Sequence, residues 1–273
     1  FAGGHVTLML AYAWTPWLLL FFDADEQISL KKQGISALIL AFIILADLRW
    51  AAYAGLLYAG YALYAQLGRG GSNIKNGILW LKKMLLQCGV AALVCFPYLF
   101  LVLQYSALST RSQMGVSEQL TLSLPPIALL GIVFPDMGGY FEWITYGGAL
   151  VLPVLIHIIF LKKNVRFWFW PLVFVASIIF ALGIRPVADI LLTLPGLNLL
   201  RVPSRALFVA LIAVSISTAQ LLDVLAKNNK EERIANTFFY NLLIFGCAAF
   251  ALLVATGMAV YNRNLALEFL WGA

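Results

Sequence analysis

The nine lysines of this chain fall into four clusters that recur at every second connection between apolar stretches. Positive charge stays on the cytoplasmic side when a membrane protein inserts, so clusters that alternate in this way orient all the crossings together. The pattern predicts a polytopic membrane protein whose lysine-bearing connections are cytoplasmic and whose other connections face outward. The clusters are Lys31 and Lys32; Lys75, Lys82 and Lys83; Lys162 and Lys163; and Lys227 and Lys230.

Hydrophobic residues make up 63% of the chain and charged residues only 11%, which is far from the balance of a soluble domain. We therefore expect an all-α transmembrane helical bundle of about eight spans, formed as a single domain over residues 1–273, with both termini outside. The apolar segments that we read as spans are 5–22, 34–47, 51–67, 84–103, 144–161, 167–184, 206–222 and 237–260.

Residues 34–67 must contain a turn if the lysine pattern is to hold. As one helix they would run about 51 Å, too long for a bilayer core of about 30 Å. A single crossing would also place Lys31 and Lys75 on opposite sides of the membrane. Two short crossings keep all the lysine clusters together, so we predict a tight outward turn from Asp47 to Trp50.

The formal net charge of +6 is spread over short connections, which fits orientation and contact with anionic lipid better than nucleic-acid binding. No nucleic-acid partner is expected. The cysteines Cys88, Cys95 and Cys247 lie within apolar segments and are interpreted as packing residues. Because the chain begins at Phe1 and stops soon after its last apolar segment, we expect it to be an internal piece of a longer protein.

The outward connections carry arginine and no lysine, so their basic charge comes from arginine alone. Arginine presents a planar, permanently charged fork that binds phosphate or carboxylate in two places. We take Arg201, Arg205 and Arg111 as candidate ligands for a lipid phosphate; snorkelling to headgroups or pairing with acids is the alternative. A helix starting at Pro203 would add a positive N-terminal dipole beside Arg205.

Two outward connections, 104–143 and 185–205, are long enough to build a site. Within the first, the apolar run 127–134 lies between prolines and is too short to span, so we expect an interfacial or re-entrant segment. Within the second, apolar residues at helical spacing over 187–194 predict a short helix. The fold expectation therefore includes short interfacial helices in the outward loops.

Other candidate site residues are scattered. His5, at the outward mouth of the first segment, is a candidate substrate ligand. Asp136 and Glu142 are candidates for catalysis, although Asp136 stands in turn-like sequence and an Asx turn is the competing interpretation. Two isolated histidines give no zinc or nucleophile constellation, so no metal ligand is assigned. No cofactor is assigned, and a requirement for a divalent cation is left open.

Four short segments then suggest a family. They are Gly4-His5 with Ala13 to Pro16; Ser123 to Pro126 with Phe134-Pro135 and Gly138-Gly139; Glu142 to Gly148; and Leu194-Pro195 with Arg201 to Arg205. With them the chain resembles bacterial polytopic membrane proteins of the YfhO-like kind, which are related to the GT-C superfamily of glycosyltransferases. In one respect it departs from them: Asp47 to Arg49 occupy a turn where relatives often carry a second Gly-His pair.

The resemblance implies a glycosyltransferase of the bacterial inner (plasma) membrane that uses a polyprenyl-phosphate-linked or polyprenyl-diphosphate-linked sugar donor on the outer face. Membrane lipid and that donor are the implied partners, with Arg201, Arg205 and Arg111 at the donor phosphate. The family's usual catalytic Asp or Glu would lie upstream of Phe1. The alternatives are a non-enzymatic transporter or flippase of a lipid-linked saccharide, and a membrane scaffold protein.

Overall fold

The computed structural model describes residues 6–22, 29–70, 74–108, 118, 120, 122–132, 143, 168–185, 188–190, 202–226 and 246. Within these residues all regular structure is helical, which confirms the predicted all-α class. The α-helices are α1 (Val6–Leu20), α2 (Leu30–Ala46), α3 (Leu48–Gly70), α4 (Ile74–Leu108), α7 (Phe169–Ala181) and α9 (Ala206–Ala226). Two shorter 3-10 helices are η2 (Pro126–Ile132) and η7 (Pro203–Arg205).

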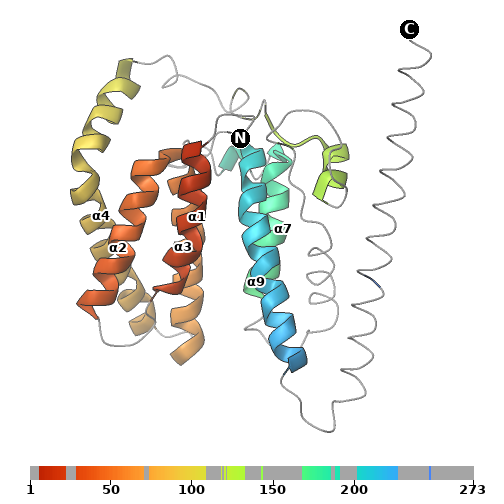
Figure 1. Cartoon of the computed structure of the whole chain (residues 1–273), viewed down its shortest axis with the longest axis horizontal. Helices are drawn as coiled ribbons and strands as arrows, with labels where there is room; N and C mark the ends of the chain where they lie inside the picture. The colour runs from red at the N-terminus through yellow and green to blue at the C-terminus, as the bar shows by residue number, and fades with distance from the viewer. Residues whose placement is uncertain are drawn as a thin grey trace. The chain divides into compact units, whose positions relative to one another are not determined.

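The chain divides into two compact units, each built from two separate stretches. The first comprises Phe1–Leu124 and Val175–Ile212, and the second Pro125–Phe174 and Ala213–Ala273. In the first unit α2 packs against α1, α3 and α4, and the four helices stand side by side (Figure 1). The second unit contains η2, the beginning of α7 and the end of α9.

Helices occupy six of the eight predicted apolar segments, namely 5–22, 34–47, 51–67, 84–103, 167–184 and 206–222. The other two, 144–161 and 237–260, lie outside the described residues except for Gly246. In the described part of the chain, two stretches are long and apolar enough to cross a membrane: Ile74–Tyr105 and Pro203–Gln220. Helices α1 and α7 are apolar but shorter, so the eight-span arrangement is not established by these helices.

The break between α2 and α3 falls within the predicted turn. Helix α2 ends at Ala46 and α3 begins at Leu48, with only Asp47 between them. Asp47 has an extended backbone, at φ −154° and ψ 107°, and its N–H still donates to the carbonyl of Ile43. One residue therefore ends one helix and starts the next, and the prediction of two helices in place of one long helix is confirmed.

Helix α4 begins earlier than the sequence suggested. The apolar segment was expected to start at residue 84, after a cytoplasmic connection holding Lys75, Lys82 and Lys83, but α4 starts at Ile74 and carries all three lysines. Its 35 residues give a length of about 52 Å, more than the core of a bilayer. Charged side chains are compatible with the part of such a helix that extends past the core, so the lysines did not show where α4 begins.

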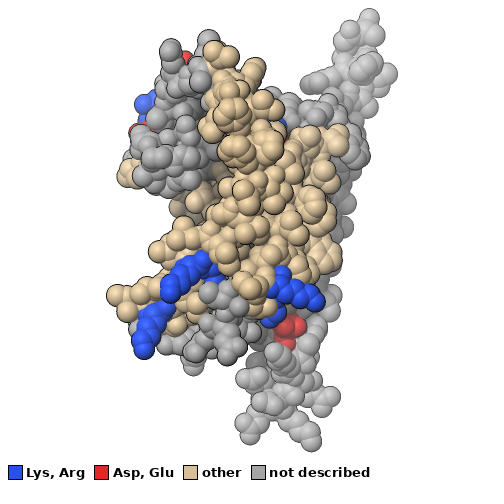
Figure 2. Space-filling model, turned by 90° about the vertical axis from the view of Figure 1, so that its left-hand side faces the viewer, with Lys and Arg blue, Asp and Glu red and all other residues tan. Residues whose placement is uncertain are grey.

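Exposed lysines gather at one end of the bundle formed by α1, α2, α3 and α4. Gln87 and Cys95 of α4 bond to Gln33 and Ala41 of α2, and the equal spacing of these pairs shows that the two helices run in the same direction. Their first turns therefore lie at the same end, where Lys31, Lys32, Lys75 and Lys82 are exposed. Figure 2 shows basic side chains concentrated there, beside a broad surface without charge.

A polar ladder runs between α2, α3 and α4 inside this unit; it consists of Gln33, Tyr58, Gln66, Lys83 and Gln87, all buried. The Tyr58 hydroxyl donates to Gln87 Oε1 at 2.9 Å, and the Gln87 amide donates to Gln33 Oε1. Closer to the lysine-bearing end, Lys83 Nζ donates to Gln66 Oε1 at 3.4 Å. Hydrogen bonds of this kind offset the cost of burying amides and an ammonium.

Candidate functional site at the start of α3 and α9

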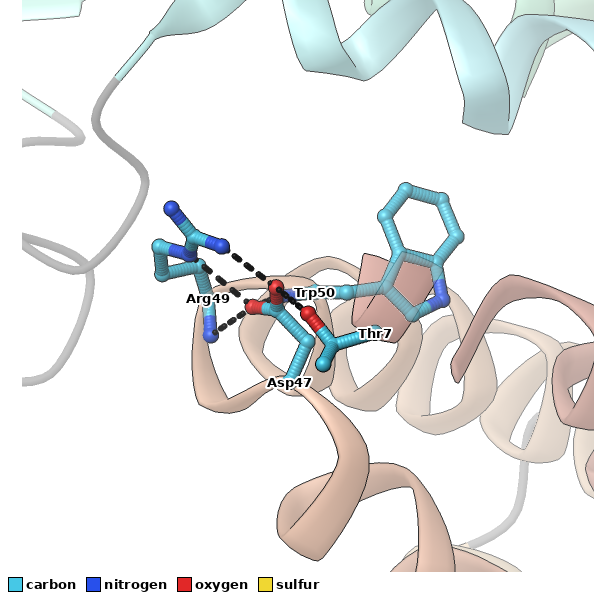
Figure 3. A network of polar contacts seen from close by, with 4 residues as sticks. All are labelled: Thr7, Asp47, Arg49 and Trp50. Carbon is cyan, nitrogen blue, oxygen red and sulfur yellow. Dashed lines mark hydrogen bonds and ion pairs between the residues drawn. The ribbon is translucent and has the colours of Figure 1, made fainter. Parts of the chain in front are cut away.

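Asp47 organises the end of the bundle opposite the lysines. Its Oδ1 accepts the backbone N–H groups of Arg49 at 2.9 Å and Trp50 at 3.2 Å, which makes Asp47 the N-cap of α3. The Arg49 guanidinium donates from Nε to Oδ1 at 3.0 Å and from Nη2 to Oδ2 at 2.6 Å. Thr7 of α1 donates to Oδ2 at 3.5 Å, so the carboxylate also joins a third helix (Figure 3).

The Asp47 carboxylate is fully engaged and ionised. Burial alone would raise its pKa, but the Arg49 guanidinium and the two backbone N–H groups outweigh burial and lower the pKa below its ordinary value. The side chain is only 2% exposed, and five donated hydrogen bonds surround its two oxygens. Asp47 is therefore unsuited to act as a general acid or as a nucleophile, and its role is to position α3 and Arg49.

Trp50 anchors the neighbouring aromatic cluster. It is fully buried, and its indole N–H donates to Thr15 Oγ1 of α1 at 2.8 Å. Its ring stacks on Tyr53 at 5.8 Å between centroids and meets Phe208 of α9 edge-on at 6.1 Å. Tyr12 of α1 packs against both Trp50 and Phe208. Aromatic packing of this kind fixes the first turns of α3 and α9 relative to each other.

The turn that leads into α9 is held in a strained conformation. Val202 has φ 62° and ψ 75°, in the left-handed region that a β-branched residue rarely occupies. Such a residue costs about 1–3 kcal/mol and persists only when neighbours enforce it. The Tyr53 hydroxyl donates to the Val202 carbonyl at 3.2 Å, and the Arg205 N–H donates to the same oxygen at 3.0 Å. Pro203 then begins the helical turn η7, as predicted.

Two buried polar side chains stand in this turn. Ser204 is fully buried, and its Oγ has no hydrogen-bond partner among the described residues. Arg205 is 4% exposed, so its side chain lies inside the protein rather than extending from the surface toward headgroups. Both precede α9, whose N-terminal dipole favours an anion. A buried guanidinium and an unpaired hydroxyl at a helix start form a suitable environment for a phosphate or carboxylate oxygen.

Of the predicted site residues, Arg205 is the one that the structure describes, and it lies in this turn. Arg201, Arg111, His5, Asp136 and Glu142 lie outside the described residues. In the part of the chain that is described, no three His, Cys, Asp or Glu residues are grouped so as to hold a metal ion.

Sequence reasoning found the turn at Asp47 but missed what its residues do. An aspartate directly after an apolar run is a helix-start signal, so the N-cap of α3 could be predicted from the sequence. The partners of Trp50 and Tyr53 were not, because Thr15 and Val202 are 35 and 149 residues away in the sequence. No local pattern encodes contacts at that separation.

Comparison with known proteins adds no relative: no family model, no curated protein and no solved structure matches this chain.

Proposed function

We propose that this chain is part of a glycosyltransferase-like, multi-pass protein of the bacterial plasma membrane that binds a polyprenyl-phosphate-linked sugar donor on the outer face. The observation that carries the proposal is the turn from Val202 to Arg205, with its buried guanidinium and unpaired hydroxyl at the start of an apolar helix. An anionic headgroup on an apolar chain matches that arrangement, because the phosphate would meet the turn at the end of a helix apolar enough to cross a membrane.

The membrane setting is supported by three features that agree. Two helices are long and apolar enough to cross a bilayer, the uncharged surface is broad, and exposed lysines gather at one end of the α1–α4 bundle. With the lysines on the cytoplasmic side, the turn before α9 faces outward, and so do both ends of an eight-span chain. The donor would then be taken from the outer leaflet.

The roles within the proposed site follow from the chemistry of the residues. Arg205 and Arg201, with Arg111, bind the donor phosphate and stabilise the charge that develops on it as the glycosidic bond breaks. His5 contacts substrate. The acid or base that activates the acceptor comes from Asp136, Glu142 or a residue beyond this sequence, because Asp47 is held as an engaged carboxylate.

The test is binding of a polyprenyl phosphate to the purified protein in nanodiscs. A charge-assisted hydrogen bond contributes about 1.5–3 kcal/mol, so Arg205→Ala combined with Arg201→Ala should weaken binding at least on the order of tenfold. Arg185→Ala, which removes an exposed arginine, is the matched control and should leave affinity unchanged. The proposal fails if the wild type shows saturable binding of neither a polyprenyl monophosphate nor a polyprenyl diphosphate, or if the double variant binds as well as the control.

Two alternatives remain distinguishable from sugar transfer. A transporter or flippase of a lipid-linked saccharide would give substrate counterflow in proteoliposomes without any sugar acceptor. A membrane scaffold would tolerate loss of the outward arginines apart from changes in stability. The same variants, tested in counterflow and in thermal unfolding, therefore separate the three functions.

A further inference from the structure

The guanidinium group of Arg49, at the start of α3, is held in one orientation by hydrogen bonds. Its backbone N–H, Nε and Nη2 all donate to the Asp47 carboxylate, which fixes the side chain from base to tip. The third guanidinium nitrogen, Nη1, points away from the carboxylate (Figure 3). The Arg49 side chain is 46% exposed, whereas that of Asp47 is 2% exposed, so an incoming group would meet the cation and not the anion.

The start of α3, which carries Arg49, lies beside the turn that precedes α9. Residues four apart share one face of a helix, so Arg49 lies on the same face of α3 as Tyr53, about 6 Å closer to the helix start. Tyr53 bonds to the Val202 carbonyl, and Trp50 contacts Phe208 on the first turn of α9. These two contacts bring the first turn of α3 beside the turn from Val202 to Arg205.

We propose that Arg49 is a second phosphate-binding residue of this site and that the site therefore selects a diphosphate-linked lipid over a monophosphate-linked one. The inference rests on the proposed function and extends its donor from one phosphate to two. Arg205 and the Ser204 hydroxyl serve the phosphate nearest α9, and Arg49 serves the next phosphate outward. Two separated cations match the larger charge and length of a diphosphate, whereas a monophosphate engages one of them.

Asp47 acts here as a positioning residue. By accepting from both Nε and Nη2 it orders a long side chain before the ligand arrives, and a preset donor loses less entropy on binding. The same carboxylate caps α3 through the N–H groups of Arg49 and Trp50. Its loss would therefore act on ligand selection and on stability, and the two effects need separate variants.

The experiment measures the affinity of the purified protein in nanodiscs for a polyprenyl monophosphate and for a polyprenyl diphosphate of equal chain length. For Arg49→Gln we expect diphosphate binding to weaken on the order of tenfold and monophosphate binding to change by less than about threefold. Arg49→Lys keeps the charge but not the fork and should fall between wild type and Arg49→Gln. Arg185→Gln is the matched control and should change neither affinity.

A second variant protects the test against misfolding. Asp47→Asn keeps a side-chain oxygen for the cap but releases the fork, so it should lower diphosphate affinity while the thermal midpoint stays near that of the wild type. Equal weakening of both ligands by Arg49→Gln, or no weakening of either while Arg205→Ala abolishes binding, would overturn the inference and leave the proposed function standing. Absence of binding to either lipid by the wild type would overturn the proposed function itself.

Discussion

The residue whose removal tests the architecture most directly is Asp47, because one carboxylate serves a cap, an ion pair and an interhelix bond. Asp47→Ala removes all of these, whereas Asp47→Asn keeps an acceptor for the N–H groups of Arg49 and Trp50. Asparagine is about as good an N-cap as aspartate. The pair of variants therefore separates the cap from the charge.

The magnitudes follow from the contacts. Loss of an N-cap costs about 1 kcal/mol, and a half-exposed ion pair such as Asp47–Arg49 contributes about 0.5 kcal/mol. We expect Asp47→Ala to lower the free energy of unfolding by about 1.5–2 kcal/mol and Asp47→Asn by about 0.5 kcal/mol. For a chain of this size, 1 kcal/mol corresponds to a shift of about 2–4 °C in the thermal midpoint, so the alanine variant should melt about 3–8 °C lower.

Thermal unfolding in detergent, followed by the fluorescence of the tryptophans, is the measurement. Arg185→Ala again supplies a control, since it removes one exposed charge without touching the cap. An asparagine variant as unstable as the alanine variant would refute the reasoning, because it would mean that the ion pair and not the cap holds the α2–α3 turn. So would an alanine variant that melts with the wild type.

The remaining expectations concern single contacts and one titration. Trp50→Phe loses the bond to Thr15 and should cost about 1–2 kcal/mol in thermal unfolding. Gly183→Ala should be destabilising by at least about 1 kcal/mol, because Gly183 has φ +64° and an added Cβ would lie 2.2 Å from Ser123 Oγ. At Gly55 an added Cβ would have no atom within 4 Å, so Gly55→Ala should be neutral or raise stability by about 0.5–1 kcal/mol. Equal melting of the two glycine variants would contradict this contrast. The folded-state pKa of Asp47 is lowered, so its ionised form contributes stability above about pH 4, and this stability is lost as the pH falls through the lowered folded pKa. The thermal midpoint of the wild type should therefore fall toward that of Asp47→Asn below about pH 4. A difference between the two midpoints that stays constant with pH would contradict this expectation.

Charge and apolar pattern located most of the described helices, since both are properties of single segments. The break at Asp47 came from the parity of the lysine clusters, and the start at Pro203 came from a helix-start signal. The boundary of α4 was missed because Lys75, Lys82 and Lys83 were taken as the content of a loop. A helix longer than the bilayer core carries charges on its own first turns, and sequence spacing does not distinguish that case from a connection.

The candidate site was predictable only in outline. Arg205 was chosen from its residue type and its place before a helix, and both are visible in sequence. Its burial, the strained backbone of Val202 and the hydroxyl of Tyr53 that holds it all depend on packing between α3 and the turn before α9. The orientation of Arg49 was not visible in the sequence, because it comes from the Asp47 carboxylate, which also bonds to Thr7 of α1.

The polar ladder between α2, α3 and α4 has a consequence for how these helices find one another. Leucine and alanine faces fit together at many rotational settings, so apolar packing alone would let a helix turn about its axis at little cost. Turning α4 by one residue, about 100°, would carry Gln87 and Lys83 away from Gln33 and Gln66 together. Each polar group left unpaired in the interior costs about 1–3 kcal/mol. The polar ladder therefore selects one rotation of α2, α3 and α4 about their axes, which apolar packing alone would leave undetermined.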